Sequence, residues 1–98
     1  MTTYFITRHT GALAWAKLHD VAFDVHLEHL IDLDNLQVGD VIIGTLPIQM
    51  VAKLNDRGVR YVHLSLDIPP AWRGRELTAD ELRECQASLQ EFQVSLVN

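Results

Sequence analysis

The stretch GDVIIGTLP, residues 39–47, combines a turn, a strand and the start of a helix. Its first two residues are typical of a turn. Val41–Ile43 is a continuous apolar run, which is typical of a strand buried on both faces. Pro47 is suited to the beginning of a helix that ends before Gly58. A buried strand leading directly into a helix predicts a parallel sheet with helices packed on it.

The same alternation of strand and helix patterns extends on both sides of this stretch. In chain order we expect a strand at 4–7, a helix at 10–19, an edge strand at 23–30, a strand at 41–43, a helix at 46–57, a strand at 61–66 and a helix at 78–94. Residues 31–39 are too few for a crossover helix, so they form either one helical turn or a plain crossing. We therefore predict a small three-layer α/β domain of Rossmann-like type. It has about four mostly parallel strands in the order 2-1-3-4 and three helices.

Local signals mark the ends of two of these helices. Thr10 is suited to capping the first one. Thr78 and Glu81 have the spacing of a capping box at the start of the last helix, with Leu77 and Leu82 placed as a hydrophobic staple. An apolar stripe is expected along that last helix at Leu82, Cys85, Leu89, Phe92 and Leu96. The single cysteine falls in this stripe and is expected in the core, where thiols are unreactive.

Composition limits the classes of function. The 98 residues predict one domain, spanning 1–98, and the formal net charge of −5 argues against binding long nucleic acid, which relies on many phosphate contacts. There is no apolar run long enough to cross a membrane, and the first residues do not resemble a signal peptide. One cysteine fits a reducing cytoplasm. The histidines lack metal-ligand spacing, so neither a metal nor another cofactor is expected.

Ligands of parallel α/β sheets bind beyond the carboxyl ends of the strands, so we expect the functional residues in the loops there. Arg8, His9, Thr10 and Gly11 follow the first strand directly before a helix, whose free N–H groups attract phosphate. Arginine adds a forked donor for phosphate oxygens, and histidine can transfer a proton near neutral pH. These residues predict an anion site.

The loops after the next two central strands add further candidates. Gly44 allows close approach of a ligand to the backbone, and Thr45 either binds ligand through its hydroxyl group or caps the following helix. Ser65 lies at the end of the strand at 61–66. His63 on that strand is expected to be a hydrogen-bonded core histidine rather than a catalyst. The three loops together predict a nucleotide pocket.

The loop DIPPAWRGREL, residues 67–77, places two arginines around a glycine in an acidic chain. Trp72 offers a flat surface on which a base can stack. Arg73 and Arg75 supply local positive charge, and Gly74 is the flexible point of a lid. The alternative is a surface loop in which the tryptophan packs on the protein and the arginines pair with nearby acids, where such pairs contribute little.

Four segments carry a resemblance to a known family. TYFITRHTGALAWAK, GDVIIGTLP, RYVHLSLDIP and AWRGRELT resemble small CRISPR-associated proteins found near type III systems. The resemblance covers nearly the whole chain and is weakest at residues 21–38. It implies a ring nuclease, a small dimeric domain similar to the CARF fold that degrades cyclic oligoadenylate messengers.

That resemblance implies a role for each loop. The expected substrate is cyclic tetra-adenylate, cleaved without metal when a ribose 2′-hydroxyl attacks the adjacent phosphorus. The catalytic candidates are Arg8, His9 and Arg73, with Arg75 as the alternative to Arg73. The substrate-binding candidates are Thr10, Gly11, Gly44, Thr45, Ser65, Trp72 and Arg75. Two other readings stay open, a non-catalytic protein that sequesters or senses the messenger and an adaptor for a CRISPR effector.

Overall fold

The computed structural model describes residues 1–29 and 33–97. Its elements in chain order are β1 (Thr3–Ile6), α1 (Thr10–Leu18), β2 (Val25–Leu27), the 3₁₀ turn η1 (Leu33–Asn35), β3 (Val41–Gly44), α2 (Ile48–Asp56), β4 (Arg60–Ser65), the 3₁₀ turn η2 (Pro70–Trp72), α3 (Ala79–Glu84) and β5 (Ser88–Phe92). No helix within these residues is long and apolar enough to cross a membrane.

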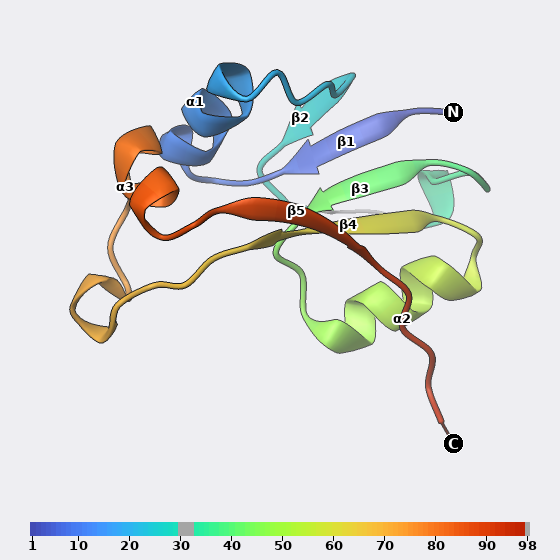
Figure 1. Ribbon diagram of the computed structural model, residues 1–98. Coiled ribbons are helices and arrows are strands. Elements are labelled where there is room, and N and C mark those ends of the chain that lie inside the picture. The colour runs from blue at the N-terminus through green and yellow to red at the C-terminus, as the bar shows by residue number, and fades with distance from the viewer. Residues whose placement is uncertain (30–32, 98) are drawn as a thin grey trace.

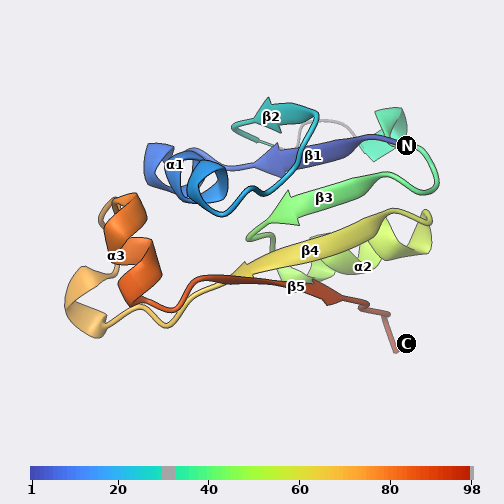
Figure 2. The ribbon, with the colours of Figure 1, turned by 45° about the horizontal axis from the view of Figure 1, so that its top comes forward.

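The strands form one sheet in the order β2-β1-β3-β4-β5, which Figure 2 shows from top to bottom. The first four strands are parallel, and β5 joins antiparallel to β4. All four residues of β3 are buried, as the apolar run predicts. The predicted order 2-1-3-4 and the edge position of β2 are thus confirmed, and the sheet has one strand more than expected.

Helices cover both faces of the sheet. Figure 1 shows α1 and α3 on one face and α2 on the other, while the carboxyl ends of β1, β3 and β4 point to the same edge. The core on the α1 side includes Phe5, Trp15 and Leu64, and the core on the α2 side includes Ile42 and Tyr61. Alternate residues of each strand supply the two cores, because successive side chains of a strand point to opposite faces. The predicted three-layer α/β class is confirmed.

All three helices end in the same backbone motif. The residue after each helix cap, namely Asp20, Gly58 or Gln86, has a positive φ, of 54°, 81° and 58° respectively. The next amide then donates to a carbonyl of the last helical turn, in the pairs Val21 to Ala16, Val59 to Leu54 and Ala87 to Leu82. This is the Schellman motif, in which glycine usually takes the left-handed position. Only one of the three helix ends has that glycine.

The prediction of a helix over 78–94 is wrong. The helix α3 ends at Glu84, and residues 88–92 form β5. The chain leaves the helix at Gln86, which has a left-handed backbone conformation. That conformation costs a residue with a side chain roughly 1–2 kcal/mol, so a glutamine in the sequence does not indicate the end of a helix. The expected apolar stripe divides accordingly: Leu82 and Cys85 are buried, whereas Leu96 is 81% exposed.

Several smaller expectations about element ends are also resolved. The cap of α1 is His9 rather than Thr10, and the cap of α2 is Pro47 rather than Thr45; neither cap makes a side-chain hydrogen bond. The capping box of Thr78 and Glu81 is confirmed. The edge strand is shorter than expected, since only residues 25–27 pair, and the last expected residue of that strand, residue 30, lies outside the described residues.

Candidate functional site

The loops that follow β1, β3 and β4 meet at one edge of the sheet (Figure 1). Residues 7–9 lead from β1 into α1, and residues 45–47 lead from β3 into α2. The longest of these three loops, residues 66–78, runs from β4 through η2 to α3; we call it the strap. Because β1 and β4 both border β3, the three loops necessarily lie together.

The strap is tied to the body of the protein at both of its ends. At its start, the N–H group of Asp67 donates to the carbonyl of Cys85 at 2.8 Å. At its end, Leu77 lies so close to Gly11 of α1 that a β-carbon on the glycine would overlap the leucine carbonyl. Between these ties, Gly74 has a φ of +84° and no neighbour in the space that a β-carbon would fill. The strap therefore has fixed ends and one open turn.

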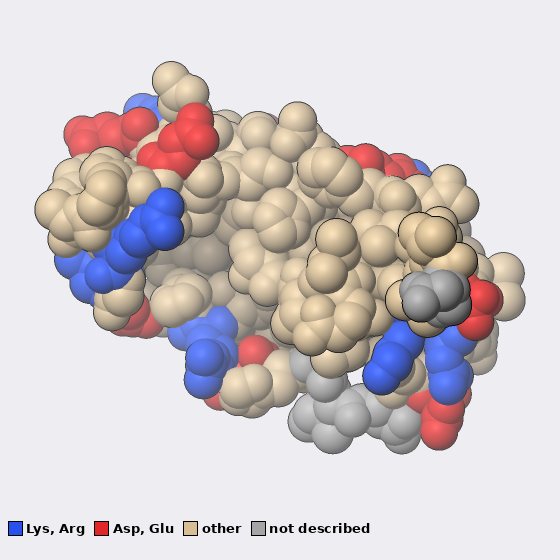
Figure 3. Space-filling model, turned by 90° about the horizontal axis from the view of Figure 1, so that it is seen from below, with Lys and Arg blue, Asp and Glu red and all other residues tan. Residues whose placement is uncertain are grey.

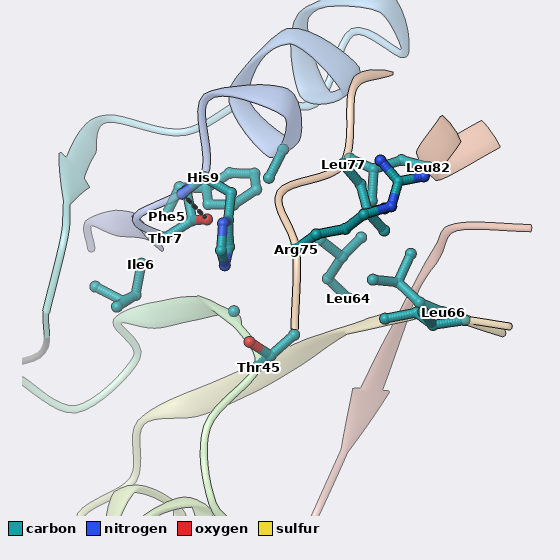
Figure 4. A pocket seen from close by; sticks show the side chains of 13 residues that line it. Phe5, Ile6, Thr7, His9, Thr45, Leu64, Leu66, Arg75, Leu77 and Leu82 are labelled. Carbon is teal, nitrogen blue, oxygen red and sulfur yellow. Dashed lines mark hydrogen bonds between the residues drawn. The ribbon is translucent and has the colours of Figure 1, made fainter. Parts of the chain in front are cut away.

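An apolar cavity of about 260 Å³ lies between the strap, α1 and the sheet. Its lining residues are Phe5, Ile6, Thr7, His9, Ala12, Gly44, Thr45, Leu64, Leu66, Ile68, Arg75, Leu77 and Leu82. Figure 4 shows the His9 ring and the Thr45 side chain at this space, from the loops after β1 and β3, with Leu64, Leu77 and Leu82 beside Arg75 on the right. The cavity thus has an apolar interior and polar groups at its border.

A second, more polar hollow of about 360 Å³ adjoins the first. Its lining residues are Ile6, Thr7, Arg8, His9, Glu28, His29, Thr45, Leu46, Pro47 and Met50. The two spaces share Ile6, Thr7, His9 and Thr45, which lie between them. The second hollow also borders the first turn of α2, whose free N–H groups favour anions. Seen from the α2 side, the surface is hollowed, with basic side chains on two sides of the hollow (Figure 3).

Ion pairs neutralise part of the positive charge around the first cavity. Arg75 pairs with Glu81 of α3 and places its guanidinium carbon 4.8 Å from the centre of the Trp72 ring. The pKa of Glu81 is lowered, first by the N–H group of Thr78 and then by Arg75. This carboxylate therefore stays charged, and Arg75 contributes little net charge to the cavity while the pair is intact.

The remaining charges at the site are less constrained. Nδ1 of His9 lies 3.4 Å from the carboxylate of Glu76, and both side chains are more than half exposed. In the described residues, no ion pair involves Arg8 or Arg73. Arg8 is therefore the positively charged residue of the second hollow that can bind an anion without first breaking an ion pair.

The chain matches one protein family over almost its whole length. The family is described as "Putative CRISPR-associated protein (Cas_VVA1548)", and the match spans residues 4–95. The chain belongs to this CRISPR-associated family. The CRISPR association that the four segments predict is thus confirmed, and every residue of both cavities lies within the match. No curated protein and no solved structure matches the chain significantly.

The structure brings together some of the predicted site residues of this family member. Those that border one cavity or both are Arg8, His9, Gly44, Thr45 and Arg75. Those that border neither are Thr10, Gly11, Ser65, Trp72 and Arg73. Two residues of the second group have other partners. The hydroxyl group of Ser65 donates to Gln90 of β5 at 2.8 Å, and Gly11 is packed against the strap.

Sequence reasoning missed two kinds of contributor to the site. The first is the apolar lining from β4 and the strap, at Leu64, Leu66 and Ile68. Their alternate spacing is the signal that could have identified them, because it continues one face of β4 into the strap. The second is Tyr61, whose buried hydroxyl group supports the loop of Thr45 from the other face. Nothing local to Tyr61 indicates that contact.

The site does not have the ligands of a metal centre. Within residues 1–29 and 33–97, no group of three His, Cys, Asp or Glu side chains is arranged to hold a metal ion. His63 has a clear structural partner instead, since its Nδ1 lies 2.7 Å from the Tyr61 hydroxyl group. The polar and charged side chains that border the two spaces are Thr7, Arg8, His9, Glu28, His29, Thr45 and Arg75.

Proposed function

We propose that this protein is a ring nuclease that binds cyclic tetra-adenylate and cleaves it, which switches off type III CRISPR signalling. The observation that carries the proposal is the pair of adjoining cavities, one apolar and one bordered by Arg8, in a member of a CRISPR-associated family. A nucleotide combines an apolar base with an anionic phosphate. The two spaces offer matching surroundings side by side.

The dimensions of the apolar cavity favour one nucleoside per chain. About 260 Å³ is slightly below the roughly 300–1,000 Å³ of sites for drug-sized ligands. It suits one adenine with part of its ribose, and a ring of four nucleotides extends beyond it. We therefore propose a homodimer that binds the ring across its two-fold axis, since an isologous pair presents each loop twice.

The proposed reaction is an internal transfer at phosphorus. The 2′-hydroxyl group of one ribose loses its proton as its oxygen attacks the adjacent phosphorus, the bond from phosphorus to the 5′-oxygen breaks, and the departing 5′-oxygen takes up a proton. The products are linear adenylates with a 2′,3′-cyclic phosphate and a 5′-hydroxyl group. Such a step depends on in-line positioning and on stabilising charge at the phosphate.

Three groups of this chain fit those tasks. Arg8 stabilises the phosphate charge, and the hydroxyl group of Thr45 hydrogen-bonds to a phosphate or ribose oxygen between the two cavities. His9, which borders both cavities, transfers the proton. The nearby carboxylate of Glu76 favours the orientation in which the Nδ1 side of the ring faces the strap.

The test is incubation of the purified protein with labelled cyclic tetra-adenylate in the presence of EDTA. The proposal predicts linear product ending in a 2′,3′-cyclic phosphate. Intact ligand that elutes with the protein would instead indicate sequestration. Intact ligand that does not bind, together with capture of a CRISPR effector subunit, would indicate an adaptor.

A further inference from the structure

One buried hydroxyl group holds both peptide groups that flank Thr45. The N–H group of Leu46 donates to the hydroxyl oxygen of Tyr61 at 2.9 Å, and that hydroxyl group donates to the carbonyl of Gly44 at 3.0 Å. The first bond fixes the peptide after Thr45, and the second fixes the peptide before it. Since a residue has only two soft backbone torsions, fixing both peptide planes fixes the direction of its Cα–Cβ bond, from which the hydroxyl group projects.

Tyr61 is well suited to hold this loop. It is 2% exposed and packs in the core on the α2 side of the sheet. Burial raises the pKa of its hydroxyl group, an effect that the hydrogen bond from Leu46 partly opposes, so the group keeps its proton and can donate. Its position on β4, next to β3, places the hydroxyl group at the end of β3 without any contribution from the strap.

The hydrogen-bond network of the Tyr61 hydroxyl group also includes His63. The single hydroxyl proton of Tyr61 is used in the bond to Gly44, so the oxygen can only accept from its other neighbours. It accepts from Leu46, and Nδ1 of His63 lies 2.7 Å away. The arrangement in which all three contacts are hydrogen bonds requires a proton on Nδ1 of His63, which donates to the tyrosine oxygen. The oxygen then makes one donated and two accepted bonds, which is its full capacity.

We infer that Tyr61 is a positioning residue that orients the hydroxyl group of Thr45 toward the bound ligand. Tyr61 borders neither cavity, so it acts only through the backbone on each side of Thr45. Thr45 itself borders both cavities and faces the space that His9 approaches from β1 (Figure 4). The inference rests on the proposed function for the identity of the ligand.

A matched pair of substitutions separates positioning from core packing. Tyr61→Phe keeps the ring in the core and removes only the hydroxyl group. Tyr4→Phe is the control, because Tyr4 packs against the same core and its hydroxyl group has no hydrogen bond within the described residues. Thr45→Val removes the hydroxyl group that Tyr61 is inferred to orient, at nearly constant size.

The first measurement is a double-mutant cycle on the cleavage of cyclic tetra-adenylate. Tyr61→Phe should lower kcat by about three- to tenfold, the factor expected when the one hydrogen bond of Thr45 to the ligand is lost, with a smaller change in KM. Tyr4→Phe should leave kcat unchanged. Combining Tyr61→Phe with Thr45→Val should cost no more than Thr45→Val alone, because the two residues act as one unit. Independent, multiplying effects, or parental cleavage by Tyr61→Phe, would overturn the inference.

The second measurement does not depend on catalysis. Amide hydrogen exchange at Leu46 should be faster in Tyr61→Phe than in the parent and in Tyr4→Phe, and the rotamers of Thr45 should average in the NMR spectrum. If the parent leaves the ring intact, the nuclease proposal fails and this measurement decides the inference alone. Unchanged exchange at Leu46 would then overturn it, and faster exchange with averaged Thr45 rotamers would support it.

Discussion

Gly11 of α1 and Leu77 of the strap lie in backbone contact so close that no β-carbon fits between them. A sequence reading assigns this glycine to ligand binding, because it follows the first strand in a phosphate-binding position. In the structure this glycine borders neither cavity, and it is required for the close packing of α1 against the strap. The contact sets how far the strap can approach α1, and thereby sets the width of the apolar cavity that both elements border.

Gly11→Ala is therefore expected to destabilise the protein and displace the strap. Alanine is the better helix former by roughly 1 kcal/mol, so the substitution would stabilise a helix that had free space. Overlap with the Leu77 carbonyl should reverse that gain and cost about 1–3 kcal/mol. Urea unfolding checks the sign. Ala14→Gly, at an exposed position of the same helix, is the control and should cost only the propensity difference.

Arg8 is expected to contribute to ligand affinity and not to folding. Arg8→Ala should weaken cyclic tetra-adenylate binding by about 10- to 150-fold, the range for a hydrogen bond to a charged group, while the melting temperature stays unchanged. Arg8→Lys should restore only part of the affinity, because a point charge lacks the forked geometry. Titration calorimetry provides the measurement.

Lys17→Ala is the matched control for Arg8, since it removes one exposed positive charge from the far end of α1. It should bind the ligand as the parent does. A large loss in melting temperature for Arg8→Ala, or equal loss of affinity in both variants, would show that Arg8 does not bind the phosphate.

The two arginines of the strap should differ in their effect on the rate of cleavage. Arg75 borders the apolar cavity, whereas Arg73 borders neither cavity. Arg75→Ala is thus expected to slow single-turnover cleavage more than Arg73→Ala does, the reverse of the assignment that favours Arg73. Because Arg75 lies over Trp72, its removal should also change the tryptophan fluorescence in a Trp15→Phe background. Parental rates for both variants would show that neither arginine takes part in the reaction.

Asp40 should make the free energy of unfolding depend on pH in the acid range. Its carboxylate accepts from the N–H groups of Gln37 and Thr2, both at 2.9 Å, and these bonds lower its pKa below the ordinary value of 3.8. A lowered pKa in the folded state means that the contribution is complete above pH 3.8 and is lost as the pH falls through the folded pKa. Asp40→Asn should therefore be less stable than the parent at pH 7.

The same comparison at low pH provides the check. The difference between Asp40→Asn and the parent should shrink as the pH falls below 3.8, because protonated Asp40 also loses acceptor capacity. Asp24→Asn is a suitable comparison with fewer bonds to lose, since Asp24 is exposed and within residues 1–29 and 33–97 its carboxylate accepts from Thr3 alone. A difference that stays constant from pH 7 to pH 3 would contradict this role for Asp40.

The sequence predicts the parallel part of the fold because its signals are local. The apolar run at Val41–Ile43 and the helix that ends before Gly58 lie within a few residues of one another, and the structure confirms both. The last strand could not be predicted in the same way. Its separation from α3 depends on a left-handed Gln86, and the spacing of Leu82, Cys85 and Leu89 fits a helix equally well.

The candidate site is also predictable only where its signals are local. The loops after parallel strands are predictable, so Arg8, His9 and Thr45 are correctly expected to come together. The partners of Ser65 and Tyr61 are not predictable, because they lie 25 and 17 residues away in sequence. Those contacts follow from strand pairing and register, which local patterns do not encode.

The central claim, that the apolar cavity holds one nucleoside of the ring while the ring is cleaved beside it, has one most direct measurement. It is the rate of conversion of labelled cyclic tetra-adenylate to linear product in EDTA by the parent and by Ile68→Trp, which places an indole in the cavity from the strap. Val38→Trp, at an exposed position before β3, is the control. We predict cleavage by the parent and by the control and none by Ile68→Trp. An intact ring with the parent, or parental cleavage by a folded Ile68→Trp, would contradict the claim.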